Sequence, residues 1–270
     1  YIGFTRKMQL LFDTSNIVFC PEFLREDTPL YDSLYPDRVV IGESVSKNNL
    51  FVKILKNCFL NESVVMTTSN DSAESIKLFS NTYLAMRVAF FNELDTFCFE
   101  QGISSHEVIS GVSQDKRIGE LYNNPSFGFG GYCLPKDSKQ LENLYLKNNI
   151  SNSLIKTVNE SNNTRQKFIL KKILALKPKS VGVYCLGMKK SSSNFRESAV
   201  LDIISDLASL EIKIYAFDPY IDIIDFPEIH QLRSLEELSE NSDVILANRI
   251  DNSLLPYMDK IVSRDIFNLG

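Results

Sequence analysis

The pattern of apolar and polar positions changes twice along the chain. In the first 70 residues, short apolar runs at residues 17–20, 38–42 and 64–66 are separated by turn residues, as in strands. Residues 47–59 have helical periodicity instead. We therefore expect residues 1–70 to hold the last strands of an α/β sheet, with its earlier strands absent from this sequence.

A long central helix is predicted over residues 72–101. The side chains of residues 70–72 are suited to capping its amino terminus, Glu74 falls in its first turn, and Gly102 marks its end. Apolar side chains recur along it every three or four residues: Ile76, Phe79, Tyr83, Met86, Phe90, Leu94 and Phe97. One face of this helix should therefore be buried against a partner.

Further helices are predicted at residues 106–112, after Pro135, and over 151–176. From Lys179 the pattern becomes an alternation of strand and helix, which predicts a second α/β unit. Its predicted elements are strands at 180–185, 212–217, 244–247 and near 261, and a helix at 197–210.

Composition and charge narrow the class of protein. The chain has 270 residues, 44% of them hydrophobic, which is enough apolar material for two core-bearing units. The formal net charge of -5 gives no electrostatic footprint for nucleic acid or an anionic membrane surface. No apolar run approaches the length that spans a bilayer and no signal peptide is evident at the start, so we expect a cytoplasmic protein.

The cysteines and histidines limit the chemistry. Five cysteines are scattered without CxxC spacing, so neither a disulfide framework nor a metal site is indicated. Only two histidines occur, which leaves little for a His-based triad or metal centre. Catalysis by this chain would therefore depend on Cys, Lys or carboxylate side chains.

The stretch around Cys133 has the strongest chemical signal. Three of the 11 glycines fall at positions 128, 130 and 131, and glycines let backbone approach a ligand closely. Pro135 suits the first turn of a helix, which would place Cys133 at a helix amino terminus. The helix dipole and Lys136 favour a nucleophilic thiolate there, and Asp137 lies four residues on as a carboxylate partner.

Residues 128–137 read GFGGYCLPKD. This string resembles the UDP-glucose and GDP-mannose dehydrogenase family, whose GFGG-x-C-x-PKD signature carries a catalytic cysteine. The resemblance covers essentially the whole chain. It implies a Rossmann-like tail of an NAD-binding domain at residues 1–70, a central dimerisation domain with the cysteine loop at 71–178, and a second Rossmann-like, UDP-binding α/β domain at 179–270.

Two further blocks carry the resemblance. Residues 21–26 read PEFLRE and residues 36–42 read PDRVVIG. By resemblance, Glu22 is an acid/base residue in the hydrolysis of a covalent intermediate, and Glu26 approaches the nicotinamide. The residues that resemble contacts of the sugar nucleotide in this block are Phe23, Leu24 and Arg25.

Lys77 and Asn81 lie four apart on the predicted central helix, where the family also has Lys and Asn. That spacing puts both side chains on one helix face, so an ammonium and an amide can stabilise one oxyanion. Residues 87–96 also resemble the family's helix, and they imply a homodimer through it.

The remaining matches implied by the resemblance concern nucleotide binding. Arg117 resembles an arginine that reaches the sugar site across a dimer interface, and Arg196 resembles a contact of NAD. The other residues implied to contact the nucleotide sugar are Tyr122, Asn124, Ser126, Gly130, Lys189 and Arg264.

The resemblance implies a four-electron oxidation of UDP-glucose to UDP-glucuronate with NAD as cofactor, through a thiohemiacetal and a thioester on Cys133. The family's GxGYxG unit is not in this sequence, so the chain by itself is expected to bind NAD poorly. A GDP-mannose or UDP-N-acetylhexosamine substrate stays open, as does a non-catalytic nucleotide-sugar-binding dimerisation module. A cysteine hydrolase is disfavoured, because neither histidine has a context suited to a Cys-His pair.

Overall fold

The computed structural model describes residues 1–25, 28–42, 50–187, 198–220 and 226–268. The chain divides into two compact units, Tyr1–Asn81 with Gln140–Ser151, and Thr82–Lys139 with Asn152–Gly270. The domain boundaries expected at residues 71 and 179 stay a prediction. No helix within the described ranges is both long enough and apolar enough to cross a membrane.

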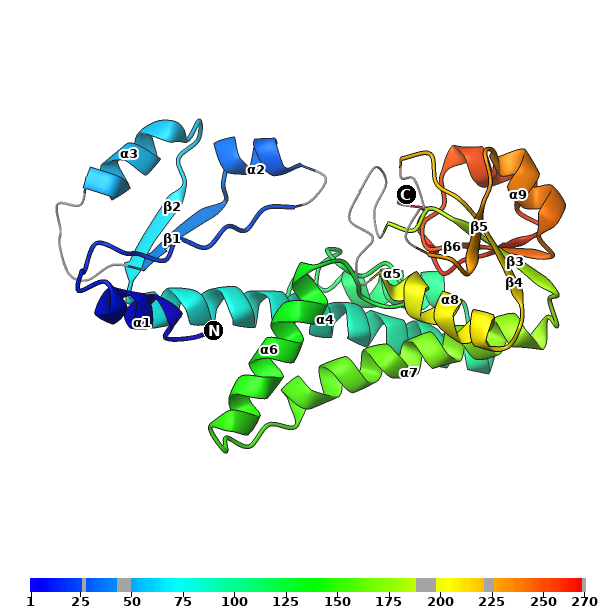
Figure 1. Cartoon of the computed structure of the whole chain (residues 1–270), viewed down its shortest axis with the longest axis horizontal. Helices are drawn as coiled ribbons and strands as arrows, with labels where there is room; N and C mark the ends of the chain where they lie inside the picture. The colour runs from blue at the N-terminus through cyan, green and yellow to red at the C-terminus, as the bar shows by residue number, and fades with distance from the viewer. Residues whose placement is uncertain (26–27, 43–49, 188–197, 221–225, 269–270) are drawn as a thin grey trace. The chain divides into compact units, whose positions relative to one another are not determined.

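The first unit contains a two-stranded parallel sheet (Figure 1). β1 (Arg38–Gly42) pairs with β2 (Val64–Thr68), and Val40 stands opposite Met66. α3 (Leu50–Cys58) connects these strands, so the unit has the β-α-β order that parallel pairing requires. The strands of this α/β unit were predicted, whereas the short helix α2 (Pro29–Leu34) was not.

The strand predicted at residues 17–20 is wrong, because this segment has no regular secondary structure. Its backbone groups are satisfied differently from those of a strand. The carbonyl oxygen of Phe19 accepts a hydrogen bond from Gly42 N at 2.7 Å, but Phe19 N donates to the side chain of Asn70 at 2.8 Å. The side chain of Asn70 therefore accepts a hydrogen bond from backbone that the predicted strand would have paired with a neighbouring strand. The helix α1 (Phe4–Leu11) precedes this segment.

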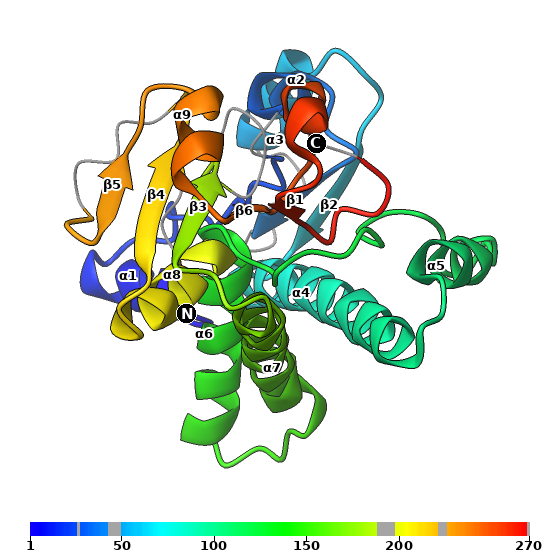
Figure 2. The same ribbon diagram turned by 90° about the vertical axis from the view of Figure 1, so that its right-hand side faces the viewer.

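The second unit is built on a five-stranded sheet whose paired strands are all parallel (Figure 2). The strand order is β5-β4-β3-β6-β7. The bounds are β3 (Ser180–Tyr184), β4 (Lys213–Phe217), β5 (Ile229–Gln231), β6 (Val244–Ala247) and β7 (Ile261–Val262). The chain reverses its winding direction between β3 and β6, which is where open α/β sheets bind ligands.

Helices cover both faces of this sheet (Figure 2). α8 (Ala199–Ser209) packs with Val181 and Val183 of β3 in the larger core. α9 (Leu235–Asn241) contributes Leu238 to a second core with Ile245. This alternation confirms the predicted second α/β unit, although β5, α9 and the 3-10 helix η1 (Asn252–Tyr257) were not predicted.

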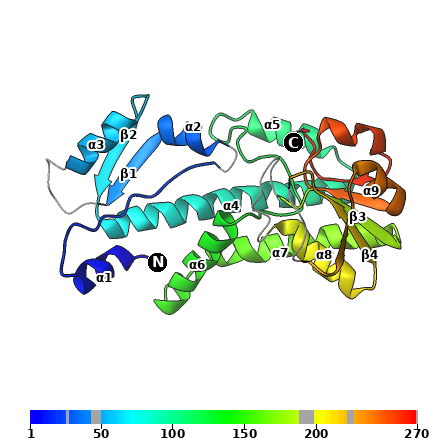
Figure 3. The same ribbon diagram turned by 45° about the horizontal axis from the view of Figure 1, so that its top comes forward.

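The central helix of the prediction is α4 (Asn70–Gln101). Its carboxyl-terminal half lies beside α7 (Leu154–Ala175) (Figure 3), and the rings of Phe99 and Phe168 meet edge to face. α5 (Ser105–Ser113) follows α4, and α6 (Cys133–Lys147) precedes α7. The cap of α4 differs from the prediction, because Ser69 Oγ accepts a hydrogen bond from Ser72 N at 3.1 Å. Residue 69, rather than residues 70–72, therefore caps this helix.

Candidate functional site

Three of the predicted site residues meet in the first unit. Lys77 Nζ donates a hydrogen bond to the carbonyl oxygen of Glu22 at 2.6 Å. The same ammonium lies 5.3 Å from the centroid of the Phe23 ring, and the guanidinium of Arg38 lies 4.3 Å from it. Two cations therefore hold one aromatic ring, which fixes the loop carrying Glu22. Arg38 was not predicted as a site residue, although it belongs to the PDR block.

Other predicted residues of this unit have separate placements. Arg25 donates through its backbone N and its guanidinium to Asp32, with 2.6 Å between Nη2 and Oδ1. These hydrogen bonds from Arg25 lower the pKa of Asp32 to about 2. Leu24 is exposed, and Asn81 is buried on α4 one turn after Lys77. Glu26 lies outside the described residues.

Cys133 is the first residue of α6, as predicted from the sequence, and it is exposed. Its thiol can therefore meet a substrate at the positive end of a helix dipole. Lys136 Nζ lies 3.3 Å from Oδ1 of Asp137 and 4.7 Å from the ring centroid of Tyr132. Asp137 is buried, with only 4% of its side chain exposed. An exposed thiol and a buried carboxylate paired with Lys136 thus share the first turns of one helix.

The glycine-containing loop before Cys133, residues 122–132, is held by side chains from helices that are distant in the sequence. Asn162 of α7 accepts from Phe129 N at 2.7 Å and donates to Phe129 O at 3.0 Å. Asn92 of α4 accepts from Ser126 N at 2.9 Å. A Cβ at Gly128 would lie 2.8 Å from Asn162 Oδ1. Gly128 also has a φ of +156°, so a side chain would not fit at this position. The predicted Gly130 is partly buried in this loop.

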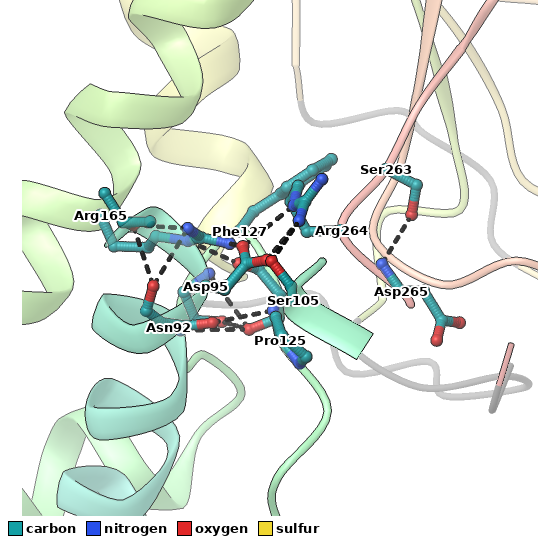
Figure 4. Close-up of polar contacts among 12 residues, drawn as sticks. Asn92, Asp95, Ser105, Pro125, Phe127, Arg165, Ser263, Arg264 and Asp265 are labelled. Carbon is teal, nitrogen blue, oxygen red and sulfur yellow. Dashed lines mark hydrogen bonds and ion pairs between the residues drawn. The ribbon is translucent and has the colours of Figure 1, made fainter. Parts of the chain in front are cut away.

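A buried charged network supports the same loop (Figure 4). Asp95 of α4 accepts hydrogen bonds from Nη2 of Arg165 at 2.6 Å and from Nε of Arg264 at 2.9 Å. Burial raises the pKa of Asp95, but the hydrogen bond from Arg264 and the charges of both arginines outweigh it and lower that pKa. Arg165 Nε also donates to the carbonyl oxygen of Ser126 at 2.9 Å, which ties the network to the loop. The resemblance assigned Arg264 to the nucleotide, whereas Asp95 and Arg165 were not predicted as site residues.

The other predicted nucleotide contacts include Tyr122 and Asn124, at the start of the loop, and residues elsewhere in the chain. Asn124 donates to Asp265 Oδ1 at 2.6 Å, and its own buried Oδ1 has no donor within the described part of the chain. Tyr122 is exposed and has a positive φ of 59°. Arg117 is exposed and pairs with Asp115 at 2.6 Å. Lys189 and Arg196 lie outside the described residues.

A small pocket lies at the carboxyl ends of β3 and β6, at the point where the winding reverses. Its lining includes Tyr184, Cys185, Gly187, Tyr220, Asn248, Arg249 and Asp251. Arg249 Nη1 donates to Pro125 O at 2.8 Å, so this pocket adjoins the loop. Burial lowers the pKa of Arg249, while the charge of Asp265 opposes that shift. None of the lining residues was predicted, and only the strand order reveals their position.

The parallel sheets, the GFGG loop and the cysteine at the start of α6 define a nucleotide-sugar dehydrogenase fold. Family models agree: the central domain of the UDP-glucose/GDP-mannose dehydrogenase family matches residues 71–164, and its NAD binding domain matches residues 5–61. The chain belongs to this family.

Two curated relatives are similar over 98% of the chain. A UDP-glucose 6-dehydrogenase of Campylobacter jejuni subsp. jejuni serotype O:2 is 47% identical, and one of Streptococcus pneumoniae is 42% identical. The chain spans 68% of the length of each. A solved UDP-glucose dehydrogenase from Pyrobaculum islandicum has the same fold, with a TM-score of 0.85 at 22% identity, over 98% of this chain and 65% of that one. The predicted family and fold class are therefore confirmed.

Proposed function

We propose that this chain carries out the substrate chemistry of NAD-dependent oxidation of UDP-glucose to UDP-glucuronate. The observation that carries the proposal is the exposed Cys133 at the first residue of α6, directly after the GFGG loop and one turn before the buried Asp137. The names of the two curated relatives support the substrate. The relatives are longer than the chain, so the activity of the whole enzyme is part of the proposal.

The proposed reaction removes two hydrides from C6 of the glucose, and NAD accepts them when bound. Glu26, Cys133 and Arg196 are the residues assigned to contact with this cofactor. The parallel β1-α3-β2 arrangement fits such a role, since dinucleotide-binding domains are built from such units.

Lys77 and Asn81 are assigned to the first oxidation, in which the C6 alcohol loses a proton to water and a hydride to give an aldehyde. An ammonium and an amide one helical turn apart can donate hydrogen bonds to the developing alkoxide. Such donors stabilise the transition state by about 3 kcal/mol in other oxyanion sites. The Cys133 thiolate then adds to the aldehyde carbon and forms a thiohemiacetal.

Glu22 and Asp137 are assigned to the final step. Loss of the second hydride to NAD and of the hydroxyl proton to water turns the thiohemiacetal into a thioester, which water cleaves to a carboxylate while the thiol leaves. A carboxylate that takes the proton of this water accelerates the hydrolysis. The contacts of Glu22 with Lys77, and of Asp137 with Lys136, hold each carboxylate-bearing residue in place.

Contacts with the nucleotide sugar are proposed for three groups of residues. They are Tyr122, Asn124, Ser126 and Gly130 of the loop; Phe23, Leu24 and Arg25 of the PEFLRE block; and Arg117, Lys189 and Arg264. The unpartnered Oδ1 of Asn124 supports this assignment, because a buried acceptor without a donor costs free energy that a ligand donor can recover.

We further propose a homodimer through α4. Its predicted apolar stripe includes large side chains that the chain leaves open: Phe79 is 43% exposed, Tyr83 56%, Phe90 58% and Phe97 61%. Phe90→Lys should give a monomer in sedimentation velocity at micromolar concentration. Leu255→Lys, at a similarly exposed apolar position in η1, is the control and should leave the dimer intact. A wild-type monomer would refute the dimer.

The experiment that tests the reaction is substitution of Cys133 in the complete enzyme. Cys133→Ala should abolish formation of UDP-glucuronate, because no thiohemiacetal can form, while circular dichroism stays unchanged. Cys58→Ala removes the other exposed cysteine and should keep full activity. Substantial acid production by Cys133→Ala would refute the covalent mechanism, and a panel of UDP- and GDP-sugars would test the substrate.

A further inference from the structure

The amino-terminal turns of α4 hold the chain segment that leads to Glu22. Glu74, which is buried, accepts hydrogen bonds from Gly3 N, from Thr5 N at 2.8 Å and from Thr5 Oγ1 at 2.7 Å. Asn70 accepts from Phe19 N at 2.8 Å. Lys77 donates to the carbonyl oxygen of Glu22, as described above. Residues 70, 74 and 77 are spaced by four and three, so one helix face holds this segment at three points.

Asn70 has the position of a helix-capping residue but not the role of one. An asparagine at a helix start ordinarily accepts a hydrogen bond from the backbone of the first turn. In this chain Ser69 does so through its hydrogen bond from Ser72 N, and Asn70 Oδ1 points to Phe19 instead. Asn70 is only 8% exposed, so its side-chain amide lies in the protein interior.

Gly42 at the end of β1 makes room for this contact. A Cβ at Gly42 would lie 2.5 Å from Asn70 Oδ1, 2.8 Å from Asn70 Cα and 3.0 Å from Phe19 O. Gly42 N donates to the carbonyl oxygen of Phe19 at 2.7 Å. Residue 19 is therefore held from two sides, its N–H by Asn70 and its carbonyl by β1.

Phe19 lies only three residues before Glu22, and Pro21 between them is buried and has a fixed φ. A residue fixed at Phe19, together with the Lys77 contact at Glu22 O, leaves little freedom for the Glu22 backbone. We propose that Asn70 is a positioning residue that sets Glu22 against Lys77 by fixing Phe19. The inference rests on the proposed role of Glu22 in thioester hydrolysis.

The test compares Asn70→Ala with Asn70→Asp, which keeps an acceptor oxygen at the same place. In the 270-residue chain, hydrogen exchange at the Phe19 amide should be at least about tenfold faster in Asn70→Ala and near wild type in Asn70→Asp. In the complete enzyme, Asn70→Ala should lower kcat by roughly ten- to hundredfold, because small misplacements of reacting groups have effects of this size. KM for UDP-glucose should fall along with kcat, so that kcat/KM changes by less than about threefold, because the slowed hydrolysis follows formation of the covalent intermediate.

Ser69→Ala is the matched control. It removes the cap of the same helix, which costs about 1 kcal/mol of stability, but leaves the Phe19 contact in place. Its kcat and its Phe19 exchange should stay near wild type. Gly42→Ala should reproduce the effect of Asn70→Ala, because the added Cβ collides with Asn70 Oδ1.

Unchanged Phe19 exchange in Asn70→Ala, or an equal loss of kcat in Ser69→Ala, would overturn the inference. If Asn70→Ala does not fold, a wild-type kcat in Gly42→Ala would overturn it as well. Glu22→Gln separates this outcome from failure of the proposed function. Full activity of Glu22→Gln would remove the catalytic assignment, whereas its inactivation beside a fully active Asn70→Ala would refute the positioning role alone.

Discussion

The buried contact of Asp95 with two arginines makes a quantitative prediction about stability. Asp95 has no exposed side-chain surface, and that of Arg165 is 2% exposed. Replacing Asp95 with Asn keeps the shape but leaves two guanidinium groups without their carboxylate. Breaking a buried ion pair from one side costs about 3–5 kcal/mol, so we expect Asp95→Asn to lose about that much free energy of unfolding.

Glu100→Gln is the matched control, because Glu100 and Lys172 also join α4 to α7. Their side chains are 47% and 32% exposed, and exposed pairs contribute about 1 kcal/mol or less. Urea unfolding followed by circular dichroism at a helix band measures both variants. Adding Arg165→Met to Asp95→Asn removes one stranded cation, so the double variant should lose less than the sum of the single losses. An Asp95→Asn variant within about 1 kcal/mol of wild type would refute the reasoning.

Three further predictions concern acid stability, the loop and the thiol. The pKa of Asp95 lies below its ordinary value of 3.8, so the ionised carboxylate contributes to folding stability above that value, and this stability is lost as the pH falls further. The urea midpoint of wild type should therefore drop more steeply below pH 4 than that of Asp95→Asn. Gly128→Ala should cost roughly 1–3 kcal/mol in thermal unfolding, because its Cβ meets Asn162, whereas Gly111→Ala in α5, with no atom within 4 Å, should not destabilise. Cys133 should be the fastest of the five cysteines to react with iodoacetamide at pH 7, and peptide mass spectrometry that ranks it behind another would contradict this.

The sequence predicted much of the fold because periodicity is local. The helix α4, the strands β1, β2, β3, β4 and β6, and the helix start at Cys133 all follow from patterns within a few residues. The strand predicted at residues 17–20 failed because its apolar run gave no sign that the Asn70 side chain would take the Phe19 amide. Asn70 and Glu74 look like capping residues in sequence, and only the folded chain shows what they bind.

The candidate site was predicted where the family motif names residues, and missed where partners are remote. Arg165 contacts Asp95 across 70 positions of sequence, and Arg264 does so across 169. No spacing rule connects such residues. The pocket at the ends of β3 and β6 was missed for the same reason, because strand order is a property of the assembled sheet.

The loop that precedes Cys133 has a consequence for protein engineering. Its ten-letter motif is continuous in sequence, but the groups that shape it belong to α4, α7 and the segment after β6, through Asn92, Asn162 and Asn248. A graft of residues 123–137 onto another scaffold would carry the glycines and the thiol without the amides that hold the backbone. We expect such a transplanted motif to be recognisable in sequence and inert in chemistry, so the transferable unit is the loop together with its three asparagines.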